Sequence, residues 1–121
     1  MQSLATLIRE QLLDPDETEF IVVTIPEAMG VAESEKLIEG PERLKIPCHQ
    51  ILINLVTPPS DCPFCGAKRR EEQRYIQQVM AEHADYRVAQ AFMLPHEIKG
   101  FDDLFEFGEG VYREQPMAHS A

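Results

Sequence analysis

The 121-residue sequence lacks the motifs and long apolar runs that would place it at once in several common protein classes. Its six glycines are scattered, and neither G-x-x-x-x-G-K-[ST] nor G-x-G-x-x-G occurs, so the chain carries no recognisable phosphate-binding loop. No candidate Ser/His/Asp set follows a predicted strand, and the chain by itself lacks the parts of a phosphoryl-transfer enzyme. No run approaches the roughly 18 apolar residues of a membrane span. Arg9 and Glu10 interrupt the region where a secretory leader would be apolar, so we expect a cytoplasmic protein.

Basic residues are also scarce. The chain has 11 Lys and Arg against 21 Asp and Glu, a formal charge of −10 that repels phosphates and argues against nucleic acids and anionic membranes as partners. The one basic cluster, Lys68-Arg69-Arg70, is predicted to be a solvated helix face. Three cysteines, an odd number, indicate reduced thiols or metal ligands rather than a disulfide scaffold.

Helices and strands alternate along the predicted secondary structure. The predicted elements are a helix ended by Asp14-Pro15, a strand over 20–25, a helix over 31–39 that Gly40-Pro41 either ends or kinks, a strand over 50–56, a helix over 67–84, a strand over 87–94, a helix over 101–107 and a frayed tail over 115–121. This order predicts an α/β fold in three layers, with a parallel sheet of about three strands covered on both faces by helices. Because both outer strands would be bare edges, we interpret residues 1–121 as one partial domain. A small self-sufficient three-stranded domain is the alternative.

A Cys-x-x-Cys pair, Cys62 and Cys65, follows the second strand after a Pro-rich loop. A structural zinc site needs four ligands, so one pair is half a site. Cys48 and His49 precede the strand, and a strand of about seven residues spans roughly 23 Å, which makes a four-ligand site within one chain improbable. A two-fold dimer would bring two pairs together as Cys₄. A metal-free reduced pair and a redox pair like that of thioredoxin or glutaredoxin remain open, although the long preceding loop counts against the latter.

Asn54 is a polar residue inside the apolar strand 50–56. Ligands of parallel α/β sheets bind beyond the carboxyl ends of strands, and an amide matches the N6/N7 edge of adenine. The alternative is that this amide caps a neighbouring loop. The segment 93–100 follows the last strand and should emerge at the same edge, where an ordinary strand-to-helix turn is the simpler interpretation.

The chain resembles the C-terminal part of the ArsA-type anion-transporting ATPases, which include arsenical pump-driving ATPases and the factors that target tail-anchored membrane proteins. The resemblance covers roughly residues 4 to 113 and rests on several ordered segments. These are Leu13-Asp14-Pro15-Asp16-Glu17-Thr18-Glu19-Phe20-Ile21-Val22-Val23-Thr24-Ile25-Pro26-Glu27, Ala32-Glu33-Ser34-Glu35-Lys36-Leu37, Ile53-Asn54, Asp61-Cys62-Pro63-Phe64-Cys65, and Pro95 with Glu97-Ile98-Lys99-Gly100.

The resemblance implies part of a deviant Walker-A P-loop ATPase that acts as a homodimer or a two-half pseudodimer. By analogy Asn54 contacts the adenine of ATP, and Pro95, Glu97 and Ile98 belong to the loop that covers the base. Cys62 and Cys65 would bind zinc across the dimer interface. In the proteins of this family, the phosphate loop and the switch regions belong to the N-terminal half. That half would be a partner of this chain. The other partners would be a second copy of the chain and a membrane-protein client or an anion pump. Lys99 stands where Arg is frequent, so a bidentate contact there would be lost.

These inferences lead to one expectation for function. The chain would supply adenine-binding and dimer-interface elements of an ATPase, and we expect no catalysis from it alone. The alternatives are a thioredoxin-like thiol exchanger that uses Cys62 and Cys65, and a non-catalytic dimerisation module that pairs through its open sheet edge.

Overall fold

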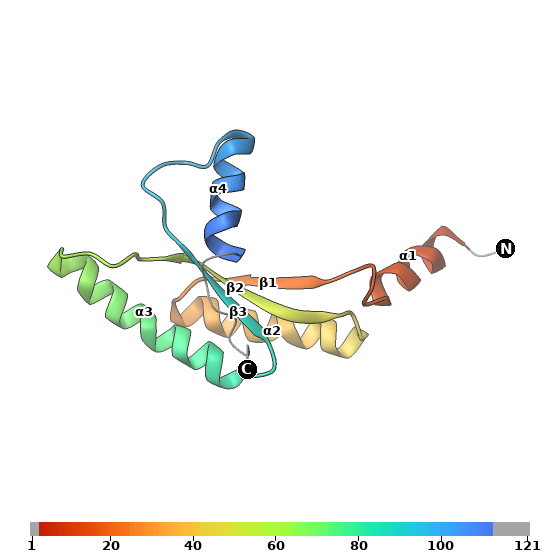
Figure 1. The fold of residues 1–121 in the computed structure, drawn as a ribbon. Helices are drawn as coiled ribbons and strands as arrows, with labels where there is room; N and C mark the ends of the chain where they lie inside the picture. The colour runs from red at the N-terminus through yellow and green to blue at the C-terminus, as the bar shows by residue number, and fades with distance from the viewer. Residues whose placement is uncertain (1–2, 113–121) are drawn as a thin grey trace.

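The computed structural model describes residues 3–112, so the predicted tail over 115–121 lies outside the described residues. Helices and strands alternate throughout, as Figure 1 shows. They are α1 (Leu4–Leu13), β1 (Phe20–Thr24), α2 (Ala28–Leu44), β2 (Cys48–Val56), α3 (Pro63–Glu82), β3 (Arg87–Phe92) and α4 (Gly100–Tyr112). Within residues 3–112, no helix combines the length and apolar character needed to cross a membrane.

The three strands form one parallel sheet in the order β1-β2-β3, which confirms the predicted α/β class. Val22 of β1 pairs with Ile51 of β2, and Ile51 pairs in turn with Val88 of β3. Each outer strand has a single strand neighbour among the described residues, so both sheet edges offer unpaired backbone groups.

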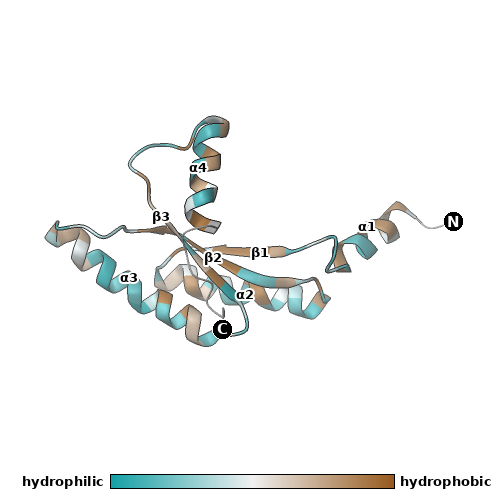
Figure 2. Ribbon diagram, viewed as in Figure 1, coloured by the Kyte–Doolittle hydropathy of each residue, from teal (hydrophilic) through white to brown (hydrophobic). Residues whose placement is uncertain are grey.

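The hydrophobic core lies between the sheet and the helices α2 and α3, which run along the same side of the sheet in Figure 1. Alternate strand residues point into it, because successive side chains of a strand face opposite ways. The core residues are Val22, Val31, Ile38, Ile51, Ile53, Val56, Ile76, Val79 and Val88. Figure 2 shows the same division, with apolar strands and a mostly polar α3.

The opposite face of the sheet is only partly covered. There α4 packs against β3, whereas Ile21 and Val23 of β1 remain 38% and 52% exposed. The prediction that strand 20–25 is buried on both faces is therefore wrong for this chain, because no helix of the described part lies over β1 on that side (Figure 1). A sequence that is apolar on both faces but covered on one fits a partial domain.

Helix α2 continues through Pro41, so the prediction of a continuous helix is confirmed and that of a break at Gly40-Pro41 is wrong. Proline removes one helical hydrogen bond. Pro41 is itself buried, and its carbonyl accepts the N–H of Ile46 at 2.9 Å, which completes the last turn. The helix then ends at Lys45, whose φ of 62° is left-handed.

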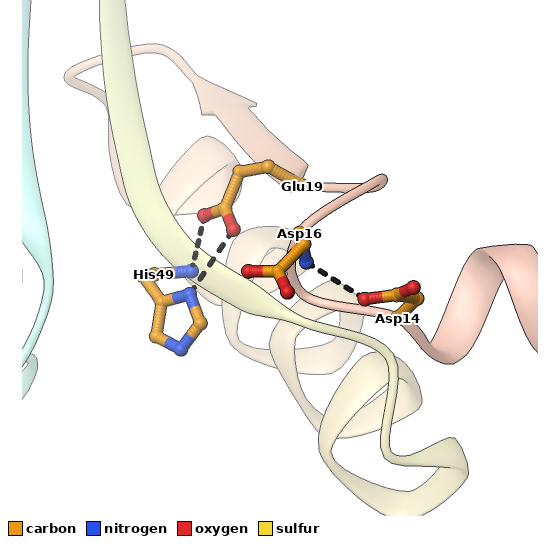
Figure 3. A network of polar contacts seen from close by, with 4 residues as sticks. All are labelled: Asp14, Asp16, Glu19 and His49. Atoms are coloured by element: carbon orange, nitrogen blue, oxygen red, sulfur yellow. Dashed lines mark hydrogen bonds and ion pairs between the residues drawn. The ribbon is translucent and has the colours of Figure 1, made fainter.

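A polar turn ends α1 and leads into β1 (Figure 3). The Asp14 carboxylate accepts the N–H of Asp16 at 2.9 Å, a local bond that competes with helix continuation. Glu19 then reaches the start of β2. Its Oε1 accepts the backbone N–H of His49 at 2.8 Å, and its Oε2 lies 3.0 Å from Nδ1 of the same residue. This contact ties the beginnings of β1 and β2 together.

Gly30 allows α2 to pack closely against the end of β1. A Cβ at this position would lie 2.7 Å from both Cγ1 and the carbonyl oxygen of Ile25. The Gly30 carbonyl also accepts the hydroxyl of Thr24 at 2.9 Å. Since a backbone oxygen is one of the atoms in the way, a side chain cannot be accommodated by a rotamer change alone.

We predict that Gly30→Ala lowers the free energy of unfolding by about 1–3 kcal/mol through this overlap. Gly108→Ala in α4 is the matched control, because a Cβ there meets no atom within 4 Å. The control should raise stability by up to about 1 kcal/mol, since Ala is the better helix former. Urea denaturation of both variants measures the difference, and equal stability of the two would contradict this account.

Candidate functional site

The carboxyl end of β2 is irregular at Asn54 and Leu55. Ile53 pairs with Gln90 and Val56 pairs with Phe92, so two residues of β2 lie opposite one residue of β3, Ala91. Leu55 has a left-handed φ of 57°, a conformation that a leucine rarely adopts. Bulges and strained residues of this kind often lie at binding sites, where they redirect a side chain. Sequence reasoning identified Asn54 and missed the bulge.

A cavity of ≈ 400 Å³ lies beside this bulge, between the end of β3, the loop after it and α4. Its apolar wall includes Ala91, so the bulge and the cavity share a residue. The polar groups around it are His96, Asp103, Glu106 and Glu109, and the apolar ones are Ala91, Phe92, Leu94, Phe107 and Val111. Three carboxylates and one imidazole suit a neutral, hydrogen-bonding ligand better than a phosphate.

None of the four predicted adenine-binding residues, Asn54, Pro95, Glu97 and Ile98, lines the cavity. Asn54 is half-buried in the bulge of β2, and Pro95, Glu97 and Ile98 are exposed in the loop between β3 and α4. Their neighbours Leu94 and His96 line the cavity instead. The loop emerges at the same sheet edge as Asn54, as predicted from the parallel strand order.

A buried carboxylate joins α3 to the end of β2. Glu72 is 5% exposed, and its two oxygens accept the backbone N–H and the hydroxyl of Thr57, both at 2.8 Å. Arg69 donates to the Thr57 carbonyl at 2.6 Å and stacks over the Phe92 ring at 5.9 Å. The interpretation of Lys68-Arg69-Arg70 as a solvated face is therefore wrong for Arg69, which is half-buried.

The Cys-x-x-Cys pair begins helix α3. The helix starts at Pro63 and not at residue 67, so Cys62 is its N-cap and Cys65 lies in its first turn. Pro63 suits the first helical position because its missing N–H would have no helical partner there. Figure 1 shows this end of α3 projecting away from the sheet. Cys62 is exposed and Cys65 half-buried.

The two thiols differ in acidity. The Cys62 side chain makes no N-cap hydrogen bond. The backbone N–H of Cys65 nevertheless lowers the pKa of the Cys62 thiol, and the Cys65 side chain lowers it further. The same side-chain contact raises the pKa of Cys65, and desolvation adds to this rise. Cys62 is therefore the thiol of the pair that loses its proton more readily.

Cys48 and His49 take no part in this site. Both belong to β2, which begins at Cys48 and not at residue 50, and they lie at the start of the strand while the Cys-x-x-Cys pair follows its end. Among residues 3–112, no group of three metal-ligating side chains contains Cys62 or Cys65. The predicted separation is confirmed, and one chain offers two thiols here.

We predict that Glu72→Ala lowers the free energy of unfolding by about 3 kcal/mol, because the N–H and hydroxyl of buried Thr57 lose a charged acceptor. The exposed neighbour Glu71 supplies the control, and Glu71→Ala should change stability by less than about 0.5 kcal/mol. Urea denaturation monitored by circular dichroism measures both. If Glu72→Ala lowers the free energy of unfolding by less than Glu71→Ala does, the Glu72 carboxylate does not fix the end of β2.

Comparison with known proteins gives consistent relatives. Residues 2–113 match the family described as "Anion-transporting ATPase" (ArsA_ATPase). The chain is 34% identical over 113 residues to "ATPase ASNA1 homolog" of Dictyostelium discoideum, covering 90% of this chain and 34% of that protein. It is 31% identical over 111 residues to "ATPase get3" of Schizosaccharomyces pombe, with 90% and 34% covered, and 31% identical over 110 residues to "ATPase GET3B" of Arabidopsis thaliana, with 88% and 27% covered. The chain thus spans about a third of the length of the curated relatives it matches, and it belongs to the ArsA family of anion-transporting ATPases.

Proposed function

We propose that this chain is the C-terminal part of an ArsA-type ATPase and supplies its adenine-binding and dimer-interface elements. The observation that carries the proposal is the bulge at Asn54 beside a cavity at the carboxyl edge of a parallel sheet, in a chain of this family. Nucleotides bind at this edge in open α/β sheets. The intact ATPase would couple ATP hydrolysis to the delivery of a membrane-protein client or to an anion pump.

The cavity fits the base of ATP better than its phosphates. An apolar wall with a few polar groups is the usual lining of a pocket for a heterocycle. The half-buried amide of Asn54 can donate to and accept from the N6/N7 edge of adenine, and the loop carrying Pro95, Glu97 and Ile98 can cover the ring. The surrounding carboxylates would repel phosphates, so in this proposal the triphosphate lies outside the cavity.

The phosphate-binding half is the proposed partner for the open side of the sheet. Ile21 and Val23 expose an apolar strip on β1, and both outer strands lack a second neighbour within the described part. The relatives are about three times as long as the aligned segment, so further family sequence is available to cover this strip. Burying strand faces against another layer is the usual completion of a parallel sheet.

The Cys-x-x-Cys pair is the proposed half of a zinc site shared between two copies of the chain. Two thiolates satisfy half of a tetrahedral Cys₄ site, and an isologous dimer supplies the same two again. The projecting position of this end of α3 in Figure 1 leaves room for a second copy. Metal binding also favours a thiol that already deprotonates readily, as Cys62 does.

A second function is favoured by one observation, the lowered pKa of the Cys62 thiol at a helix start. A more acidic exposed thiol followed by a less acidic one is the arrangement of a thiol exchanger, in which the first attacks and the second resolves the mixed disulfide. Here the chain would act through Cys62 and Cys65 without nucleotide.

The adenine proposal predicts that adenosine, added to the purified chain, shifts the backbone amide signals of 54–55, 91–94 and 96–98 in NMR spectra. Asn54→Ala should weaken this binding about tenfold, because the base loses a paired donor and acceptor. Gln50→Ala, at the other end of β2, is the matched control and should leave it unchanged. Equal binding by both variants would exclude Asn54 as the base contact, and steady ATP turnover by the purified chain would overturn the fragment proposal.

The zinc proposal predicts that Cys62→Ser removes about half a zinc atom per chain, because two chains share one ion. Cys48→Ser is the control, since Cys48 lies at the start of β2, and it should leave the metal content unchanged. Metal analysis together with the solution mass measures both. The thiol exchanger would be favoured if Cys62→Ser left the zinc content unchanged and the unsubstituted chain formed and reduced a Cys62–Cys65 disulfide reversibly.

A further inference from the structure

Three potential metal ligands converge where α2 meets the C-terminal end of α3, away from the sheet edge and the cysteine pair. Glu35 comes from α2, Glu82 is the last residue of α3, and His83 is the C-cap of that helix. One ligand atom of each residue lies within 4.8 Å of the ligand atoms of the other two. This is the one such group of three among residues 3–112.

The backbone beneath these side chains is held in place by the core. Glu35 follows Ser34, which is 3% exposed and donates its hydroxyl to the Val31 carbonyl at 2.7 Å. On the other helix, the carbonyl of Val79, itself 2% exposed, accepts the N–H of His83 at 3.0 Å. The distance between the two helices at this point is therefore set by buried residues and not by the ligands.

Neighbouring side chains orient two of the three ligands. Gln78 donates to Oε1 of Glu82 at 3.2 Å, a contact that restricts the rotation of this carboxylate. The His83 ring packs edge-on against Tyr86, with ring centroids 5.6 Å apart and planes 77° apart. The Tyr86 hydroxyl in turn donates to Glu42 at 3.2 Å. Partners of this kind commonly support metal ligands from outside.

Electrostatics favour a cation at this point. The ligand atoms of Glu35, Glu82 and His83 all lie within 4.8 Å of one another. Two carboxylates held together by helix packing repel each other at neutral pH. A divalent cation between them would replace this repulsion with attraction and would be bound by the imidazole of His83 as well.

We propose that Glu35, Glu82 and His83 bind a divalent first-row transition cation, with water in the remaining coordination positions. Two carboxylates and one imidazole suit Mn²⁺ and Zn²⁺, and the absence of a thiolate distinguishes the set chemically from the cysteine pair. Ligand atoms around such an ion lie about 3 to 4.4 Å apart, so small rotamer changes close the observed spacing. The bound ion would bridge α2 and α3.

The test uses the 121-residue chain and Mn²⁺ alone, because this oxygen-preferring ion competes poorly for thiolates. We expect paramagnetic broadening of NMR signals centred on Glu35 and His83, and a rise in the thermal midpoint as Mn²⁺ is added. Glu35→Gln and His83→Gln should each weaken Mn²⁺ binding at least about tenfold. Far-UV circular dichroism without metal verifies that both variants are folded.

The matched control is His49→Gln. His49 also lies against a glutamate, Glu19, but lacks a second carboxylate, so its loss should leave Mn²⁺ binding unchanged. Broadening centred elsewhere would overturn the proposal, as would folded Glu35→Gln and His83→Gln variants that bind Mn²⁺ within twofold of the original. Loss of binding in a Cys62→Ser, Cys65→Ser double variant would also overturn it, by assigning the ion to the cysteine pair.

Discussion

The carboxyl edge of this sheet depends on one buried carboxylate. Glu72 accepts the N–H and the hydroxyl of Thr57, while Arg69 takes the Thr57 carbonyl, so every polar group of that residue is engaged by α3. Removing a carboxylate from water costs several kcal/mol unless hydrogen bonds compensate, and here two do. The contact fixes where the chain leaves β2, and Arg69 extends it to Phe92 beside the cavity. The proposed nucleotide edge and the start of the cysteine loop therefore share one anchor.

The element order and the parallel sheet could be predicted because each rests on patterns many residues long. The local details could not. Leu55 adopts a left-handed φ although leucine has no preference for it, so the bulge that displaces Asn54 leaves no mark in the sequence. Glu72 has the charge and spacing of a solvated helix residue, and only the position of Thr57 makes its burial favourable. The start of α3 is one such detail: proline suits the first helical position, yet the predicted helix begins at residue 67, whereas α3 begins at Pro63.

The strands of the sheet are rich in apolar residues, but the helices of this chain cover one face of the sheet only in part. In β1, the exposed residues Ile21 and Val23 flank the buried Val22, and all three are β-branched. Antiparallel sheets that face water usually carry polar residues on the open side, whereas strands of parallel sheets are apolar on both. On the second face of the sheet, α4 covers β3 but not β1. This partial cover agrees with a family whose members are about three times longer than the matched segment.

The two proposals for the cysteine pair differ in how many thiolates they need. Thiol exchange requires one. The backbone N–H of Cys65, and then its side chain, lower the pKa of the Cys62 thiol, whereas the same side-chain contact raises the pKa of Cys65. Zinc binding requires both thiols to lose their protons, and the ion itself drives the second loss. Under the thiol-exchange proposal, a single chain is sufficient. Under the zinc proposal, a second copy is needed, because four thiolates around one ion would offset the deprotonation of Cys65 in each chain. The two proposals therefore differ in the oligomeric state that each requires.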